Sequence, residues 1–209
     1  YRQKVEEAKK QVVGTVTETM SSTRIPTAFA AGATPTGSYA GQVVAQAFRS
    51  TNRAIDVAIQ NVGGVRTDLL TGEITMAKVI EVLPFSNTIV MINMKGSDIV
   101  KVLNEGAYYA LHSGSTGAFP ASAGLRYDVF LSGGEYEVIK NVEVQDKTTR
   151  QWSPISNDTV YTVATNSFTA LGKDNYLTFK RVRDANSTVF EDTYILYYVP
   201  LVDYIKGLP

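Results

Sequence analysis

The spacing of apolar and polar residues divides the chain into predicted helices and strands. Apolar residues three to five positions apart, such as Val43, Ala47 and Phe48, indicate one face of an amphipathic helix, whereas alternation indicates a half-buried strand. The pattern predicts helices over residues 1–11, 39–53, 76–82, 97–111 and 195–205. It predicts strands over residues 12–20, 54–60, 88–95, 124–131, 137–145 and 159–165. Strands and helices that do not alternate regularly favour the α+β class.

Capping residues and prolines set the expected limits of several elements. Threonine and serine are favoured at helix N-caps. Thr75 is therefore expected to cap the helix over 76–82, and Ser97 the helix over 97–111. Pro200 is expected to mark the start of the last helix or a kink in it. Residues 21–38 and 166–176 are rich in small and polar residues, and we expect two loops there.

Composition excludes several classes of function. The 20 lysines and arginines balance the 20 aspartates and glutamates, so a sequence-independent duplex binder is not expected. No apolar run approaches the roughly 20 residues that span a bilayer, so no membrane contact is expected from this chain. The chain has no cysteine, which excludes disulfides, thiolate zinc sites and cysteine nucleophiles.

The residues that usually carry hydrolytic chemistry are sparse. His112 is the one histidine, so no histidine pair is available for a metal and no second histidine can serve a serine as base. Asp56 and Asp68 have no spacing that marks them as an acid–base pair. We therefore expect no catalytic residue, no metal and no cofactor in this chain.

Three loop sequences suggest a binding site instead. They are Asn-x-Gly-Gly-x-Arg at residues 61–66, Pro-Phe-x-Asn at residues 84–87, and Asn-x-Phe-x-x-x-Gly-x-Asp-x-Tyr at residues 166–176. Each could be a plain turn, helix stop or loop if it stood alone. A glycine pair at a strand end, however, also lets the backbone approach a ligand closely.

In this order and at this spacing, the three sequences resemble the C-terminal domain of the 5'-nucleotidase family, whose members include bacterial 5'-nucleotidases, UDP-sugar hydrolases and cyclic-nucleotide phosphodiesterases. The resemblance extends from about residue 12 to the end of the chain. It implies a layered α/β/β/α sandwich with mixed sheets, in which residues 12–209 form the substrate-binding domain. Residues 1–11 lie where the family has its interdomain linker helix.

The resemblance also implies the residues that bind substrate. They are Arg24, Asn61, Gly63, Gly64, Arg66, Phe85, Asn166, Phe168 and Asp174. The two phenylalanines match the aromatic pair that sandwiches the base, and stacking of this kind contributes about 1–3 kcal/mol per base. Asp174 matches the carboxylate that holds the ribose hydroxyls, and Arg66 matches the arginine that contacts the substrate, with Asn61 in the same pocket.

Two assignments and two departures complete the predicted site. The amide of Asn166 is expected to contact the base edge, and Arg24 is expected to match an upstream arginine that helps to hold phosphate. Lys173 and Asn175 replace two glycines of the usual Gly-Gly-Asp-Gly-Tyr sequence.

The resemblance implies a parent enzyme with a second domain. In the family, an N-terminal metallophosphoesterase domain carries two divalent metal ions and hydrolyses the phosphate ester, while the C-terminal domain binds the nucleotide. The expected partners are therefore a nucleotide or nucleoside and that N-terminal domain. The expected location is the periplasm, the cell exterior or the cell surface of a bacterium.

Two other hypotheses stay open on the sequence alone. The chain could be a freestanding module that captures nucleosides without a catalytic partner. It could also be a structural domain in which the altered sequence at residues 172–176 has lost ligand binding.

Overall fold

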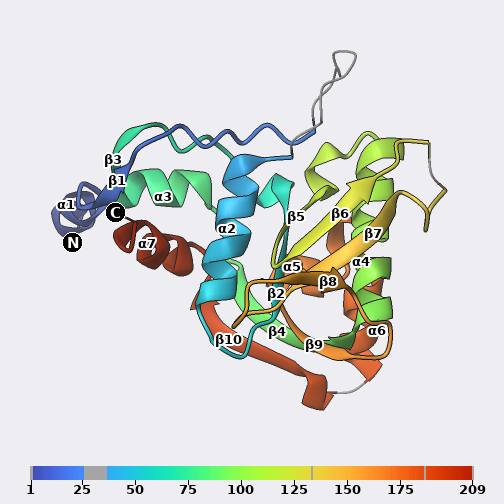
Figure 1. The fold of residues 1–209 in the computed structure, drawn as a ribbon. Coiled ribbons are helices and arrows are strands. Elements are labelled where there is room, and N and C mark those ends of the chain that lie inside the picture. The colour runs from blue at the N-terminus through green and yellow to red at the C-terminus, as the bar shows by residue number, and fades with distance from the viewer. Residues whose placement is uncertain (1, 26–36, 133, 186, 209) are drawn as a thin grey trace.

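A mixed five-stranded sheet lies at the centre of the computed structural model, which describes residues 2–25, 37–132, 134–185 and 187–208 (Figure 1). Across the sheet the strands are β10 (Phe190–Leu196), β4 (Thr88–Lys95), β9 (Val160–Asn166), β2 (Val57–Asn61) and β5 (Pro120–Ala123). β2 and β9 run parallel, whereas the other neighbouring strands run antiparallel. The parallel pair therefore ends at one edge of the sheet.

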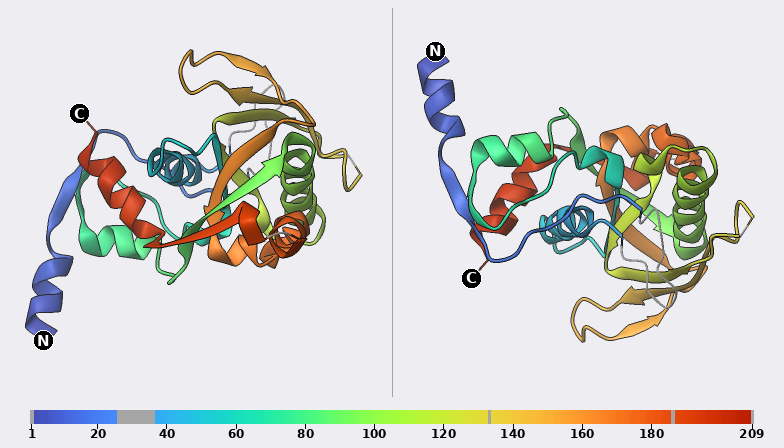
Figure 2. Two further views of the ribbon diagram at one scale, coloured as in Figure 1. Left: turned by 90° about the horizontal axis from the view of Figure 1, so that it is seen from below. Right: turned by 90° about the horizontal axis from the view of Figure 1, so that it is seen from above.

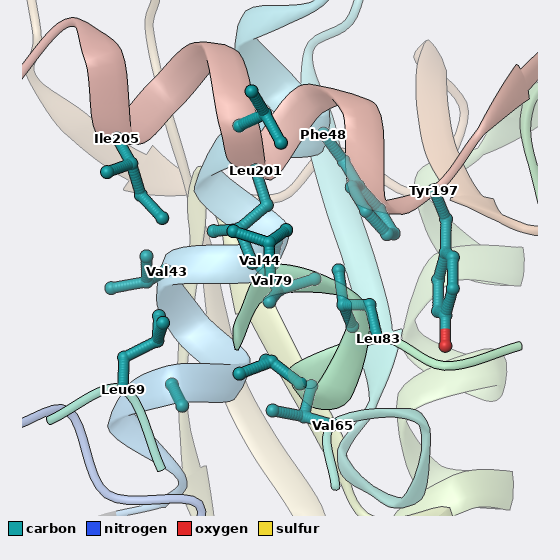
Figure 3. Close-up of a cluster of buried hydrophobic side chains, with 14 of the residues drawn as sticks. Val43, Val44, Phe48, Val65, Leu69, Val79, Leu83, Tyr197, Leu201 and Ile205 are labelled. Carbon is teal, nitrogen blue, oxygen red and sulfur yellow. The ribbon is translucent and has the colours of Figure 1, made fainter. Parts of the chain in front are cut away.

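One face of this sheet packs against helix α2 (Tyr39–Ser50). Helices α3 (Met76–Val82) and α7 (Tyr198–Lys206) pack close to α2 and complete an apolar cluster, part of which Figure 3 shows. In β2 the side chain of Ala58 belongs to this cluster, while Val57 and Ile59 belong to the cluster on the opposite face. Alternation along the strand thus gives the sheet two apolar faces.

The opposite face packs against helices α4 (Gly96–His112) and α6 (Leu177–Ala185). A three-stranded antiparallel sheet, β6 (Leu125–Val129), β7 (Ile139–Gln145) and β8 (Trp152–Pro154), contributes apolar side chains to the same cluster. This second sheet lies beside α4 (Figure 2).

The N-terminal part of the chain forms a smaller unit. β1 (Val12–Val16) pairs antiparallel with β3 (Gly72–Thr75), and α1 (Arg2–Lys9) projects from that end of the molecule (Figure 2). The remaining short elements are η1 (Val62–Gly64), η2 (Thr116–Ala118), α5 (Ser167–Ala170), η3 (Lys173–Asn175) and η4 (Ser187–Val189).

The predicted α+β class with mixed sheets is confirmed, and several predicted elements are close to the observed ones. The strand over 88–95 and the helix over 76–82 have the predicted bounds, and Thr75 caps that helix by accepting the Lys78 N–H. Pro200 lies in the first turn of α7, where its missing N–H leaves no helical bond unmade.

Other predictions are wrong in detail. Ser97 does not cap α4, because that helix begins at Gly96 and its cap residue Lys95 makes no side-chain bond. The helix predicted over 195–205 begins only at Tyr198, after β10 has ended. The strand predicted over 12–20 stops at Val16, and the loop predicted over 166–176 contains α5 and η3. Most of the predicted loop over 21–38 lies outside the described residues.

Candidate functional site

The parallel pair of strands brings two of the loop sequences together. β2 ends at Asn61 and leads into η1, while β9 ends at Asn166 and leads into α5. Because β2 and β9 are parallel neighbours, both of these turns leave the same edge of the sheet. Side chains that stand 105 positions apart in the sequence, Asn61 and Asn166, are therefore in hydrogen-bond contact.

A cavity of about 490 Å³ opens at this edge, within the roughly 300–1,000 Å³ typical of small-molecule sites. Its lining residues are Arg24, Asn61, Gly63, Gly64, Arg66, Phe85, Asn87, Gly114, Ser115, Thr116, Gly117, Phe168 and Asp174. All of the predicted binding residues except Asn166 line it. The fold therefore gathers the three loop sequences around one space.

The two predicted aromatic residues both remain accessible. Phe85 is 46% exposed and Phe168 is 36% exposed, so each can offer a ring face to a ligand. The Arg66 guanidinium lies over the Phe85 ring, with its central carbon 5.9 Å from the ring centroid, and its Nη1 donates to the Gly63 carbonyl. A cation is thus held next to an aromatic surface.

A chain of side-chain hydrogen bonds orients the carboxylate of Asp174. Asn61 Nδ2 donates to Asp174 Oδ2 at 2.8 Å. Asn61 Oδ1 in turn accepts from Asn166 Nδ2 at 2.9 Å, and that nitrogen also donates to Gln60 Oε1 at 2.8 Å. Since Asn166 supplies both donors, the Asn61 amide must turn its own donor toward Asp174.

Asn166 does not have the position expected of a base-contacting residue. Its side chain is fully buried, and its amide oxygen accepts the Thr169 N–H that begins α5. The polar atoms of this amide are therefore all used inside the protein. Asn166 lies behind Asn61 and supports the site instead of facing the cavity.

Gly63 lets the turn after β2 lie directly against the loop that contains η2. A Cβ atom on Gly63 would be 2.9 Å from the Gly117 Cα, so any side chain there would push the two backbones apart. On Gly64 a Cβ would be 2.4 Å from the Gln60 side-chain nitrogen. Packing against the η2 loop therefore requires glycine at position 63, whereas the atom nearest to a Gly64 Cβ is the end of the Gln60 side chain.

The φ angles of residues 172–176 explain why Lys173 and Asn175 can stand where the family usually has glycine. Gly172, Asp174 and Asn175 have φ angles of 81°, 55° and 66°. Asparagine and aspartate are the side chains that best tolerate this left-handed region, so Asn175 can replace glycine at modest cost. Lys173 is not among the residues with positive φ, which explains why a lysine can stand there.

Arg24 lines the cavity next to Gly117. Its Nη1 atom lies 3.3 Å from the position that a Gly117 Cβ would occupy. Arg24 also lines a second cavity of about 600 Å³ beside α2 and β6, which contains no other predicted binding residue. The structure thus places this predicted cation at the boundary of the site.

Sequence reasoning missed part of the lining. Asn87 belongs to the Pro-Phe-x-Asn sequence but was not expected to face the cavity, and residues 114–117 carried no recognised signal. The glycines at 114 and 117 were the available clue, since glycines mark close backbone approach.

The remaining candidates for chemistry have structural contacts. His112 stacks on Tyr108 at the end of α4, with ring centroids 4.2 Å apart. Asp56 pairs with Lys147 at 2.8 Å, and Asp68 accepts two bonds from Ser22. Within the described residues, histidine and acidic side chains form no group of three that could hold a metal ion. Over the same residues, no helix has the length and apolar character needed to cross a bilayer.

Comparison with known proteins identifies the class. The family model described as "5'-nucleotidase, C-terminal domain" matches residues 12–181. The chain therefore belongs to this family.

Individual relatives agree with that assignment. The chain is 36% identical over 214 residues to the NAD 5'-nucleotidase of Haemophilus influenzae, a match that covers 100% of this chain and 35% of that protein. The solved structure of that nucleotidase superposes with a TM-score of 0.88 at 35% identity, over 99% of this chain and 37% of the other. A 5'-nucleotidase precursor from Thermus thermophilus gives a TM-score of 0.81 at 28% identity, over 99% and 38%. The chain thus spans about a third of the length of these relatives.

Proposed function

We propose that this chain is the substrate-binding domain of a 5'-nucleotidase-type phosphohydrolase and that its 490 Å³ cavity holds the nucleoside part of a nucleotide. One observation carries the proposal. The cavity joins two accessible aromatic rings, a guanidinium and an oriented carboxylate, which are the groups that a base, a phosphate and a ribose need.

The base is proposed to stack between Phe85 and Phe168. Both rings line the cavity and both are partly exposed, and stacking tolerates any base because each base has two π-faces. Asn87 lines the same cavity two residues after Phe85, and its amide can both donate and accept. We assign to Asn87 the base-edge contact that the sequence had suggested for Asn166.

The sugar and phosphate are proposed to bind on the polar side. Asn61 donates to Asp174 Oδ2, and this bond fixes the orientation of the carboxylate. The other oxygen, Oδ1, is then available to accept from the ribose hydroxyls. Arg66 and Arg24 provide positive charge along the lining, and a guanidinium suits phosphate oxygens.

The parent enzyme is proposed to contain an N-terminal metallophosphoesterase domain with two divalent metal ions. Such a pair of metals activates water for attack on phosphorus, so this chain would bind the nucleotide without hydrolysing it. Helix α1 is proposed to be the link between the domains and to permit closure. The name of one relative, a cell wall protein of Listeria monocytogenes, supports a location outside the cytoplasm.

Ligand-induced thermal stabilisation tests the binding proposal. AMP and adenosine should raise the melting temperature of the 209-residue chain without added metal, since ligand at 100-fold its Kd contributes about 2.7 kcal/mol. The Phe85→Ala, Phe168→Ala double variant should lose this rise. Tyr136→Ala, which removes an exposed aromatic ring outside the cavity lining, should keep it. No rise with any nucleotide at millimolar concentration would favour a domain that has lost its ligand.

The sequence of the full gene product distinguishes the parent enzyme from a freestanding module. A metallophosphoesterase segment encoded upstream of this chain would reject the freestanding module. If the full gene product lacks the histidine and aspartate ligands of such a domain, the hydrolase proposal fails while the binding proposal stands.

A further inference from the structure

Tyr197 makes contacts that no motif of the site explains. It lies between β10 and α7, outside residues 12–181 that the family model matches, and its side chain is fully buried. We propose that Tyr197 is a positioning residue that holds residues 84–87, the Phe85 loop, against the turn after β2, and so sets the geometry of the base-binding part of the cavity. This inference rests on the proposed function.

Three hydrogen bonds tie Tyr197 to two segments of the cavity wall. Its backbone N–H donates to the Asn87 carbonyl at 2.9 Å. Its hydroxyl oxygen accepts the Phe85 N–H at 3.1 Å and donates to the Gly64 carbonyl at 3.3 Å. Tyr197 therefore binds the Phe85 loop at two backbone groups, the Phe85 N–H and the Asn87 carbonyl, and links the loop to Gly64.

The surroundings of the ring fix the direction of its hydroxyl. Figure 3 shows the Tyr197 ring within the apolar cluster of Phe48, Leu83 and Leu201, with its hydroxyl at the margin of the cluster. Burial raises the pKa of Tyr197 to about 12, so the hydroxyl keeps its proton and can donate at any physiological pH.

Phe85 and Tyr197 have different roles in this site, because Phe85 contacts the base whereas Tyr197 holds Phe85 in place. The Phe85 ring is 46% exposed, whereas its backbone N–H is bound to the hydroxyl of a fully buried side chain. A ligand that stacks on an already placed ring does not have to order the loop first, and this preorganisation improves affinity. Tyr197 would thus act on the ligand only through the groups it holds.

Removal of the hydroxyl tests this role. Tyr197→Phe in the 209-residue chain should raise the Kd for AMP, measured by isothermal titration calorimetry, about tenfold, which corresponds to about 1.4 kcal/mol. Tyr127→Phe is the matched control, because it removes a hydroxyl that donates to the Pro120 carbonyl and neither residue lines this cavity, so its Kd should stay unchanged. Equal Kd values for Tyr197→Phe and the unmodified chain would overturn the proposal.

A double-mutant cycle separates positioning from general stabilisation. If Tyr197 acts through Phe85, adding Tyr197→Phe to Phe85→Ala should weaken AMP binding much less than it does alone. Additive losses would show that the hydroxyl acts elsewhere and would overturn the proposal.

Amide hydrogen exchange on the ligand-free chain tests the contact without any ligand. The Phe85 N–H should exchange far more slowly than the amide of the exposed neighbour Ser86, and Tyr197→Phe should abolish that difference. Fast exchange at Phe85 in the unmodified chain would refute the positioning contact by itself. If the contact is present but AMP does not bind the unmodified chain, the failure lies in the proposed function.

Discussion

Replacing Asn166 with aspartate changes one atomic group at the centre of the buried hydrogen-bond chain. The new carboxyl keeps an oxygen to accept the Thr169 N–H, so the start of α5 stays capped. The amide nitrogen that donates to Gln60 at 2.8 Å and to Asn61 at 2.9 Å becomes an oxygen that faces two acceptors. Asn166→Asp therefore removes two donors from a fully buried position without changing side-chain volume.

The expected loss of stability depends on pH. A protonated carboxyl can still donate to one of the two acceptors, so at acid pH the variant should lose about 1–2 kcal/mol. Burial raises the pKa of the introduced carboxyl above the ordinary value of about 3.9, and the nearby Asp174 adds to the rise. A pKa raised in the folded state costs nothing below the ordinary pKa, and its cost grows as pH rises through the raised value. Each unit of that rise adds about 1.4 kcal/mol at neutral pH.

Urea unfolding between about pH 4 and pH 8, followed by circular dichroism, measures this difference. The gap in unfolding free energy between the variant and the unmodified chain should widen with pH. Asn166→Ala is the control, since it cannot ionise. Its gap should be large and constant, about 3–5 kcal/mol from the lost cap and two buried acceptors without donors. A gap for Asn166→Asp that is equal at both ends of the pH range would refute the geometry described for Asn166.

Three further variants test other features of the structure. Gly63→Ala should lower stability by about 1–3 kcal/mol and weaken AMP binding, because its Cβ would be 2.9 Å from the Gly117 Cα; unchanged urea midpoints would contradict this contact. Tyr194→Gly should raise stability by about 1 kcal/mol in the same assay, since Tyr194 is 84% exposed at a φ of 56°. Burial raises the pKa of Glu105, so stability should fall as pH rises through that pKa, and Glu105→Gln should remove this fall while keeping an acceptor for Thr178.

Elements with a clear pattern were predictable, and elements decided by tertiary pairing were not. The strand over 88–95 has an unbroken apolar run, Ile89 to Ile92, followed by alternation up to Lys95, and Thr75 supplies an ordinary helix cap. β5, in contrast, consists of proline, alanine and serine, which have no strand pattern, and pairing with β2 holds it in the sheet. β10 is an edge strand whose apolar C-terminal residues lead without a break into the apolar spacing of α7.

The same distinction applies to the site. The family resemblance, carried by the order of the three loop sequences, predicted that Asn61, Arg66 and Phe168 lie in one site, and all three line the same cavity. The sequence could not show which asparagine faces the cavity and which supports it, since Asn87 and Asn166 differ only in their surroundings. The role of Tyr197 could not be predicted for a related reason, because no sequence motif distinguishes this buried tyrosine from other aromatic residues in an apolar segment.

The parallel pairing of β2 with β9 also has a kinetic consequence. The two strands bring together residues that stand 105 positions apart, Asn61 and Asn166, and closing so long a stretch of chain is entropically costly. If this pairing forms only after the folding transition state, the cavity is absent from that transition state. A bound nucleotide would then slow unfolding and leave the refolding rate unchanged, because it stabilises contacts that the transition state lacks. Ligand dependence of the two rates would thus report when the strands from the two halves of the chain meet.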